Sequence, residues 1–578
     1  MNASILADGV SLARYQRLLD VGLALGSEKN QDRLMERILV EAKEMCKADG
    51  GTLYLRTDDD KLSFSIMRTD SLNIQLGGTT GQAIHLPSVP LFNDDGEPNR
   101  KNVASYCVHL IQSVNIEDAY NARGFDFSGT RRFDEKNHYR SKSFLTIPMT
   151  NQDGRVIGVL QLLNAKNENG DVVPFSPDLQ EMVEALASQA AVALDNQLLA
   201  DGQRKLMEAF IKLIAAAIDD KSPYTGGHCR RVPLLTLMLA EAARDDVNGP
   251  FKVFQLEDDE RYELKIAAWL HDCGKIITPT HVMDKATKLE AIYDRIHDVK
   301  ARIEILRQDA RILCLQTQLD GGERGAAEKV RDATIAELDE NWLFLETANI
   351  GGEFMSDEEK ARVRTIEQTQ VCIDGIEGPL LDEDEAANLC ISRGTLNDEE
   401  RIIINGHMVQ TIRMLESLPF PRSLQNVPEI AGGHHEKMDG TGYPKGVFAG
   451  DMSVLARTMA IADVFEALTA QDRPYKKGKP LSEAMRIMGF MKKDNHLDAD
   501  LFNLFVTSGV YRKYATDYLP VELIDDVDEA ALLAIEPKPF VSPERHKRDE
   551  RKRDFLDEYR TLVRRTPAMD EVARHDKA

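Results

Sequence analysis

Long apolar runs are absent from this 578-residue sequence, and its N-terminus, Met1-Asn2-Ala3-Ser4, lacks a basic stretch followed by an apolar one. The first absence argues against a membrane-spanning helix, and the second argues against a secretory signal. We therefore predict a cytoplasmic protein without membrane insertion.

Paired cysteines are also lacking, because the seven cysteines are odd in number and none forms a Cys-x-x-Cys pair. Free thiols in a reducing compartment fit this pattern better than a disulfide framework does. Positive charge is scarce as well: 96 Asp and Glu outnumber 72 Lys and Arg and give a formal net charge of -24. Net repulsion opposes binding to nucleic acid polymers and anionic membranes, so a phosphate ligand would need a local positive site such as metal ions.

The chain is too long for one ordinary core, and roughly two to four domains are expected. In residues 1–175 a helical pattern precedes two predicted β-hairpins, one over residues 51–56 and 62–66 and one over residues 144–149 and 156–164. The order of helix, hairpin, variable middle, hairpin and helix resembles a GAF domain, an α+β sensor fold for small ligands.

A second feature of the same region resembles a motif found in GAF domains that bind cyclic nucleotides. Its residues are Asn164, Lys166, Phe175 and Asp178. The resemblance implies an unknown small ligand for this domain. The alternative is that Asn164 and Lys166 are surface turn residues of a domain that only dimerises, since a fold does not fix a function.

Residues 176–218 are predicted to form a long linking helix. Ser176-Pro177-Asp178 is a helix start, and the apolar residues that follow are interrupted only by Gly202. Such a helix can be half of a parallel coiled coil in a homodimer. Two ordinary core helices with a bend at Gly202 are the alternative.

Two histidine motifs carry the chemistry. The stretch from Gly432 to Pro444 places His434 and His435 side by side in a glycine-rich loop. Adjacent imidazoles repel one another when protonated, so a cation that binds them neutral explains the pair. Far upstream, His271-Asp272 ends an apolar helical run, and the chain must fold back to bring the two motifs together.

Four further motifs follow the same order along the chain as in one known family: Thr225-Gly226-Gly227-His228, Ile404-Asn405-Gly406-His407, Ile461-Ala462-Asp463 and Asp472-Arg473-Pro474-Tyr475-Lys476. With the two histidine motifs they resemble the HD-GYP phosphodiesterases of the His-Asp phosphohydrolase superfamily, which hydrolyse cyclic di-GMP. The resemblance implies an all-α catalytic domain over residues 219–536.

The family does not usually carry the segment at about residues 289–398. Apolar residues recur there in steps of three and four, and Gly321-Gly322 permits a reversal, which predicts an inserted helical hairpin. Residues 537–578 are a charged tail, with a solvated helix expected around residues 551–563.

The family pattern implies a site for two metal ions. Asp272 would bridge them, with His228, His271 and Asp463 on one metal and His407, His434 and His435 on the other. A bridging hydroxide would be the nucleophile. Iron or manganese is favoured over zinc by a His-rich site with carboxylates and open positions.

The resemblance also assigns residues around the metals. Lys275 would stabilise charge on the phosphate or aid the leaving oxygen, and Arg473 and Lys476 would hold the nucleotide's phosphates. Tyr443 would shape the substrate entrance, and its loop is a docking surface for diguanylate cyclases in the family. We expect Glu436 to orient an imidazole rather than to bind metal.

One position departs from the family pattern. Some members hold a third metal with a glutamate four residues before the first histidine, and Tyr224 stands in that place here. A two-metal site is the simpler inference, with Tyr224 and Glu466 as possible extra ligands. We expect the linear dinucleotide pGpG to accumulate ahead of GMP.

Two readings compete with a signal-regulated cyclic di-GMP phosphodiesterase: a non-catalytic cyclic dinucleotide receptor and a phosphohydrolase for mononucleotides. Intact metal ligands argue against the first, and the complete Gly-Tyr-Pro loop argues against the second. Cyclic GMP-AMP as the substrate, the ligand of the sensor and the sign of regulation stay open.

Overall fold

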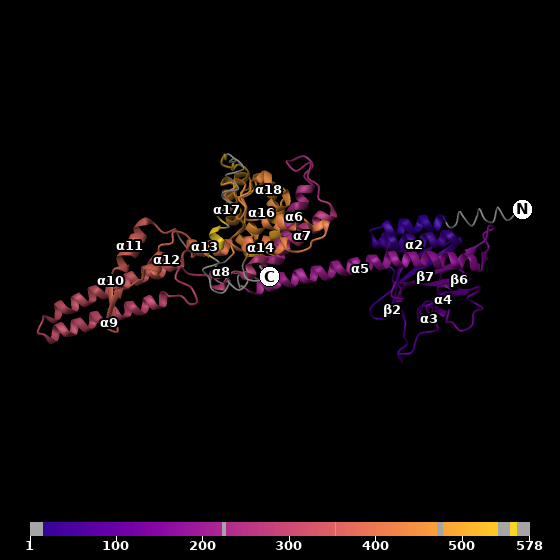
Figure 1. Ribbon diagram of the computed structural model, residues 1–578, viewed down its shortest axis with the longest axis horizontal. Helices are drawn as coiled ribbons and strands as arrows, with labels where there is room; N and C mark the ends of the chain where they lie inside the picture. The colour runs from indigo at the N-terminus through magenta and orange to yellow at the C-terminus, as the bar shows by residue number, and fades with distance from the viewer. Residues whose placement is uncertain are drawn as a thin grey trace. The chain divides into compact units, whose positions relative to one another are not determined.

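A computed structural model describes residues 16–221, 227–352, 354–470, 478–540, 555 and 557–562. The predicted site residues Tyr224, Arg473 and Lys476 lie outside these ranges. The chain forms two compact units, Met1–Met207 and Glu208–Ala578, and the long helix α5 (Pro177–Lys221) contributes to both (Figure 1). Within the described ranges, every helix falls short of the length and apolarity that a bilayer span requires.

The first unit is built on an antiparallel sheet with the strand order β3-β2-β1-β7-β6-β5. Its central strands are β1 (Ala48–Arg56) and β7 (Val156–Lys166), flanked by β2 (Lys61–Thr69), β3 (Ile74–Gly77), β6 (Phe144–Thr150) and β5 (Val114–Ile116). β4 (Val89–Pro90) pairs with β2, and β8 (Val172–Val173) pairs with β7. Both predicted hairpins are confirmed: Leu53 of β1 lies opposite Ile66 of β2, and Ile147 of β6 lies opposite Leu160 of β7.

Helices cover both faces of this sheet (Figure 1). α2 (Gln31–Cys46) and the first half of α5 pack on one face, where Leu34, Ile38, Val183 and Leu186 share a core with Leu53. On the other face α3 (Val103–Leu110) packs against the sheet, and α4 (Ser128–Asn137) follows in the chain. The unit is therefore α+β with buried helices on both sides, as the resemblance to a GAF domain implied.

Asn164 is not the surface turn residue that the alternative reading required. It is buried with φ 55°, its Oδ1 accepts the N–H of Lys142 (2.7 Å), and its Nδ2 donates to the hydroxyl of Tyr139 (2.8 Å). Lys166 forms an ion pair with Asp49. Asn164 therefore fastens the segment between α4 and β6 to the sheet, and Lys166 joins β7 to β1.

The second unit is helical. Around the predicted site lie α6 (His228–Arg244), α7 (Asp258–Leu270), α14 (His407–Glu416), α15 (Val427–Gly432) and α16 (Val454–Thr469), with the short helices η2 (Cys273–Ile277), α8 (Thr280–Met283) and α13 (Asp398–Asn405). Behind α16 an aromatic core contains Phe465, Phe502, Phe505, Tyr511 and Tyr514. It is formed with α17 (Leu481–Lys493), α18 (Ala499–Thr507), α19 (Val510–Tyr518) and α20 (Glu529–Leu533).

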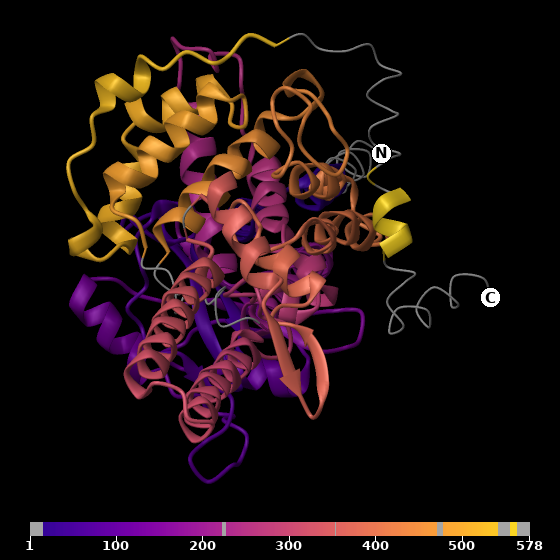
Figure 2. The same ribbon diagram turned by 90° about the vertical axis from the view of Figure 1, so that its left-hand side faces the viewer.

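The inserted segment contains the predicted hairpin. α9 (Ile296–Leu319) and α10 (Arg324–Ile350) run side by side, with the reversal at Gly321, where φ is 88° (Figures 1 and 2). Of the residues predicted in the seam between these helices, Val299 and Ile303 are buried, whereas Ile292, Leu313 and Val330 are 97%, 60% and 62% exposed. The sequence did not reveal α11 (Asp357–Glu367), the strands β9 (Gln370–Ile373) and β10 (Ile376–Pro379), or α12 (Glu383–Leu389).

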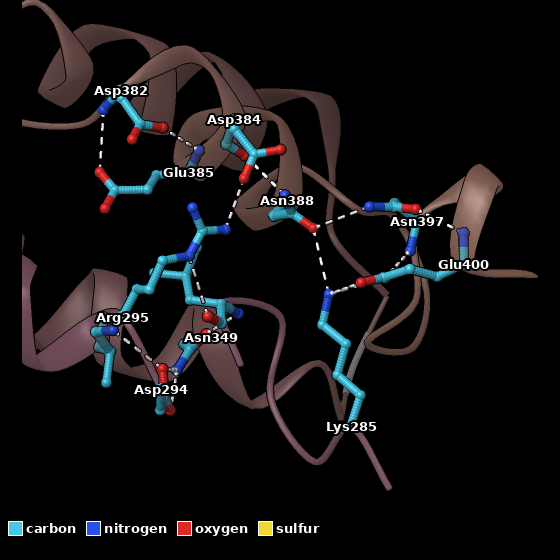
Figure 3. A network of polar contacts seen from close by, with 12 residues as sticks. Lys285, Asp294, Arg295, Asn349, Asp382, Asp384, Glu385, Asn388, Asn397 and Glu400 are labelled. Carbon is cyan, nitrogen blue, oxygen red and sulfur yellow. Dashed lines mark hydrogen bonds and ion pairs between the residues drawn. The ribbon is translucent and has the colours of Figure 1, made fainter. Parts of the chain in front are cut away.

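A polar network fixes the base of the insertion (Figure 3). The buried Lys285 Nζ donates to both carboxylate oxygens of Glu400 (2.8 Å each) and lies 3.4 Å from Asn388 Oδ1 (Figure 3). Glu400 belongs to α13, which ends one residue before Gly406 and His407. The insertion is thus fastened to the helix that precedes a predicted ligand.

Residues 557–562 of the tail are helical, as we expected, and most of them are exposed, but Tyr559 is buried. Its hydroxyl accepts a hydrogen bond from Gln410 Nε2 (3.0 Å), and a side chain at Gly406 would collide with its ring. Apolar contact of Tyr559 with α14 outweighs the charge of the surrounding sequence.

Candidate metal centre

The first group of candidate ligands comes from two helix ends and from the middle of a third helix. His228 begins α6, and His271 and Asp272 directly follow α7. One ligand atom from each lies within 4.8 Å of the others. Asp463 on α16 completes the group, since its Oδ1 lies 3.1 Å from His228 Nε2 and 3.7 Å from His271 Nε2.

The second group consists of His407, His434 and His435, with ligand atoms also within 4.8 Å of one another. His407 begins α14, and the histidine pair follows α15. Asp272 lies between the groups: its Oδ2 is 3.2 Å from His271 Nε2, and its Oδ1 is 3.3 Å from His407 Nε2. Each oxygen of this one carboxylate therefore faces a different set of imidazoles.

The same backbone contact orients three of these imidazoles. The Nδ1 atoms of His271, His407 and His434 lie within hydrogen-bond distance of the carbonyl oxygen three residues earlier, at Ala268 (2.8 Å), Ile404 (2.5 Å) and Ala431 (2.7 Å). A ring that donates from Nδ1 presents a lone pair at Nε2, which is the form that binds a metal.

Four polar atoms at the centre are buried without a hydrogen bond among the described residues: His271 Nε2, Asp272 Oδ1, His407 Nε2 and His434 Nε2. Buried polar atoms without partners are costly and need an explanation. Bound cations supply one, because all four atoms belong to candidate ligands. The residues present fit two metal ions, one for each group.

Carboxylates determine the electrostatics of the first group. Burial lowers the pKa of His271, but Asp272 and Asp463 more than reverse this effect and raise it to about 9. The pKa of His228 is likewise raised against burial, chiefly by Glu466. Burial raises the pKa of Asp272, but Lys275 and His271 hold it well below the ordinary value.

The second group has the opposite character. Burial and the neighbouring His271 lower the pKa of His434 to about 4. Burial, His434 and His407 lower the pKa of His435 well below its ordinary value. These two imidazoles are neutral at pH 7, as metal binding requires.

Lys275 reaches the centre as well. Its Nζ lies 2.6 Å from Asp272 Oδ2, one turn of η2 away. Burial lowers its pKa, but Asp272 more than reverses that effect, so the ammonium is charged at pH 7. The structure thus places a cation beside the carboxylate that both groups share.

Among the described residues Glu466, and not Glu436, is the glutamate that contacts an imidazole of the centre. Glu466 Oε2 contacts His228 Nδ1, and its Oε1 accepts from Arg231 Nε (2.6 Å), so both oxygens are engaged. Glu436, which we expected to orient an imidazole, instead accepts the backbone N–H groups of Lys445 (2.6 Å) and Val447 (3.2 Å). The role of Glu466 could have been predicted from the sequence, because residues three positions apart, such as Asp463 and Glu466, lie on the same face of a helix.

Aromatic rings stack outward from the second group. Tyr443 lies parallel to His435, with ring centroids 4.9 Å apart and an interplanar angle of 16°. Phe555 stacks on Tyr443 at 6.1 Å. Sequence reasoning missed Phe555, because its position depends on the docking of a distant segment.

The first unit has its own candidate ligand site. A cavity of about 550 Å³ opens between the sheet and α3 and α4. Its lining combines apolar side chains such as Phe64 and Leu163 with the polar groups of Thr52, Tyr139 and Gln161. This mixture is typical of a site for a small organic molecule.

Comparisons with known proteins match both units. A GAF domain model matches residues 30–194, and an HD domain model matches residues 384–501, the stretch that contains the second ligand group and Asp463. Among solved structures, the GAF domain of an Acinetobacter phosphoenolpyruvate-protein phosphotransferase aligns with 33% of this chain and 98% of its own at 14% identity, with a TM-score of 0.25.

Curated relatives match over shorter stretches. A 3'3'-cGAMP-specific phosphodiesterase of Vibrio cholerae is 40% identical over 113 residues, which cover 20% of this chain and 25% of the relative. A cyclic di-GMP phosphodiesterase of Pseudomonas aeruginosa is 40% identical over 119 residues, covering 20% and 28%. One of Thermotoga maritima is 39% identical over 98 residues, covering 17% and 26%.

The chain spans about a quarter of the length of these curated relatives. Both family matches agree with the folds described above, an α+β unit followed by a helical one. The chain therefore combines an N-terminal GAF domain with a helical HD domain.

Proposed function

We propose that the protein is a metal-dependent phosphodiesterase that hydrolyses a cyclic dinucleotide, with cyclic di-GMP as the leading substrate. One observation carries the proposal: Asp272 lies between two groups of histidines, and the buried Nε2 atoms of His271, His407 and His434 have no hydrogen bond among the described residues. Two metal ions in such a site would activate water and neutralise charge on the phosphoryl oxygens. Relatives named as cyclic di-GMP and 3'3'-cGAMP phosphodiesterases support the choice of substrate class.

In this proposal the protein's own residues hold and orient the reaction. His228, His271 and Asp463 would bind one ion, His407, His434 and His435 the other, and Asp272 both. Lys275, 2.6 Å from Asp272, would place its ammonium near the phosphate and stabilise the charge that develops there. Tyr443 would form one wall of the entrance, and Arg473 and Lys476 would hold the phosphates.

Metal content and turnover test the proposal together. Protein prepared without oxygen should contain about two iron or manganese ions per chain and should hydrolyse cyclic di-GMP. Metal-loaded protein that binds cyclic di-GMP without turnover would identify the non-catalytic receptor instead. Protein that takes up neither ion would overturn the metal site.

Equal concentrations of cyclic di-GMP and 3'3'-cGAMP, offered in competition, would decide between the two substrates. The ratio of the two kcat/KM values measures the preference directly. We expect cyclic di-GMP to be hydrolysed faster.

The product is proposed to be pGpG, with GMP following later. A second cut must accommodate a new terminal phosphate, which a third metal would hold, and Tyr224 replaces the glutamate that supplies its ligand in the resembling family. Tyr224→Glu should shift the products toward GMP in a chromatographic time course. GMP that appears without a lag in the unaltered protein would contradict the proposal.

We also propose a homodimer through α5. Leu199, Leu206 and Leu213 recur every seven residues, and each is more than half exposed (57%, 58% and 65%). A heptad of exposed leucines is the seam of a parallel coiled coil. Replacing all three with Gln should convert the dimer to a monomer in light scattering; a monomeric unaltered protein would contradict it.

We propose that the chain is divided into four segments and that the first regulates the catalytic domain. We propose a sensor over residues 1–175, a linking helix over 176–218, a catalytic domain over 219–536 with the insertion at 289–398, and a tail over 537–578. A small molecule in the sensor cavity would regulate hydrolysis, and a diguanylate cyclase would dock on the loop of Tyr443. A change in turnover on deletion of the first unit would support the regulatory part.

A further inference from the structure

The C-terminal end of α5 carries two side chains of opposite charge that contact different segments of the metal centre. Lys221 Nζ donates to the carbonyl oxygens of Lys275 (3.1 Å), Ile276 (2.5 Å) and Thr278 (2.7 Å). These carbonyls lie at the end of η2, which begins one residue after Asp272. A cation at the carbonyl end of a helical turn satisfies acceptors that the turn itself leaves unpaired.

Asp219 makes the matching contact at the other segment. Its Oδ2 accepts the N–H of Gly227 (3.2 Å), and its Oδ1 accepts the N–H of Cys229 (3.4 Å). Gly227 is the N-cap of α6 and has no side chain to cap the helix. The buried carboxylate of Asp219, which belongs to α5, caps it instead. The two hydrogen bonds enclose His228, the first residue of α6.

We propose that Asp219 and Lys221 are positioning residues that make the end of α5 part of the frame of the first ligand group. Asp219 fixes the backbone on both sides of His228, and Lys221 fixes the turn that follows Asp272. A displacement of this helix end would therefore move the backbone beside His228 and Asp272, two residues proposed to hold one metal ion. The inference rests on the proposed metal site.

Asp219 and Lys221 lie on the same helix that enters the core of the GAF domain. The first half of the same helix is built into the core of the GAF domain through Val183, Leu186 and Ala190. A ligand that alters the packing of this half has a continuous helix through which to act on residues 219 and 221. A small shift of residues 219 and 221 is enough for such an effect. Groups that contact a metal's ligands change the affinity of the site for the metal.

The first test uses the full chain loaded with Co²⁺ alone. Lys221→Met removes the ammonium and keeps the length of the side chain, and Lys221→Arg keeps the charge. Lys212→Met, nine residues earlier on the same helix, is the matched control, because the Lys212 side chain is 51% exposed and, among the described residues, pairs with Glu208 of α5 at 3.7 Å. Lys221→Met should weaken Co²⁺ binding at the first group about ten-fold and alter the visible absorption, with a smaller effect at the second group because Asp272 is proposed to hold both ions. Lys221→Arg should restore most of the affinity and of the absorption.

Asp219→Asn tests the contacts beside His228 independently. Its Co²⁺ affinity tests the inference if Lys221→Met does not fold. The substitution should weaken binding of the Co²⁺ ion at the first group and leave the other unchanged. Co²⁺ affinities and spectra of Lys221→Met and Asp219→Asn that equal those of Lys212→Met would overturn the inference. Co²⁺ binding that responds as expected in a protein that hydrolyses no cyclic dinucleotide would overturn the proposed activity and leave the inference standing.

Discussion

The two ligand groups of the metal centre share Asp272 but differ in charge. In the first group Asp272, Asp463 and Glu466 surround two imidazoles, and the pKa of His271 rises to about 9. In the second group three imidazoles face one another, and the pKa of His434 falls to about 4. Two sites built mainly from the same residue type therefore hold different numbers of protons at pH 7.

This difference follows from the origin of the neighbours. α16 contributes Asp463 and Glu466 to the first group from one face of a helix, whereas the imidazoles of the second group lie mainly against other imidazoles. A cation entering the first group must displace protons, and one entering the second finds neutral rings. The groups should therefore respond differently to mutation and to pH.

The largest effect is expected where the groups are joined. Asp272→Ala should remove both ions and abolish hydrolysis, since each oxygen of Asp272 faces a different group. His435→Ala should remove mainly one ion. Its loss of activity should exceed the roughly 100-fold loss that follows removal of a residue that contacts a metal ligand but not the metal. Elemental analysis of both variants checks this; equal metal content would show that Asp272 does not bridge.

The next effect separates the two buried glutamates. Glu466→Gln should weaken metal binding at the first group about 10- to 100-fold, because Glu466 contacts His228 Nδ1 and Arg231. Glu436→Gln is the matched control: its carboxylate holds the backbone of Lys445 and Val447, so the first group should be unaffected. Titration with Mn²⁺ followed by electron paramagnetic resonance measures both variants, and identical affinities would remove the distinction.

A smaller effect concerns protons. His271, with its pKa raised to about 9, is charged at pH 7 and must lose its proton when a metal binds; His434, with its pKa lowered to about 4, is already neutral. Metal binding to the first group should release protons at pH 7, and the release should disappear above pH 9. Calorimetry in buffers of different ionisation enthalpy detects it, and a buffer-independent enthalpy would contradict it.

The same shift gives the metal-free protein a pH dependence. The folded pKa of His271 exceeds its ordinary value, so its stabilising contribution is complete below about pH 6.5 and is lost as pH rises towards 9. Urea unfolding of the metal-free protein between pH 6 and pH 9 measures this loss. His271→Gln should remove most of it.

The smallest effect is expected at a hydrogen bond between the segments of the two groups. The Gly274 N–H donates to Thr411 Oγ1 (2.9 Å), which joins η2 to α14. Thr411→Val should lower the free energy of unfolding by about 1 kcal/mol. Thr236→Val is the control, because among the described residues the Thr236 hydroxyl donates to Val232 of its own helix, so its loss should lower the free energy of unfolding less. Equal urea midpoints for both variants would contradict a joining role.

The sequence by itself determined the features that depend on neighbours along the chain. Alternation and turn residues fixed both hairpins of the sheet, the step of three and four residues fixed α9 and α10, and Ser176-Pro177 fixed the start of α5. The candidate ligands could also be named in advance, since each lies in a short motif with a recognisable order.

The tertiary structure alone decided which distant groups meet. Glu466 contacts a histidine 238 positions away, Tyr559 lies against a helix 149 positions earlier, and Lys221 caps a turn more than 50 positions later. A carboxylate such as Glu436 or Glu466 has the same chemistry in the sequence wherever it points, and only packing determines whether an imidazole or a backbone N–H group lies within its reach. The identity of the ligands was therefore local information, whereas the charge of each group depends on contacts that exist only after folding.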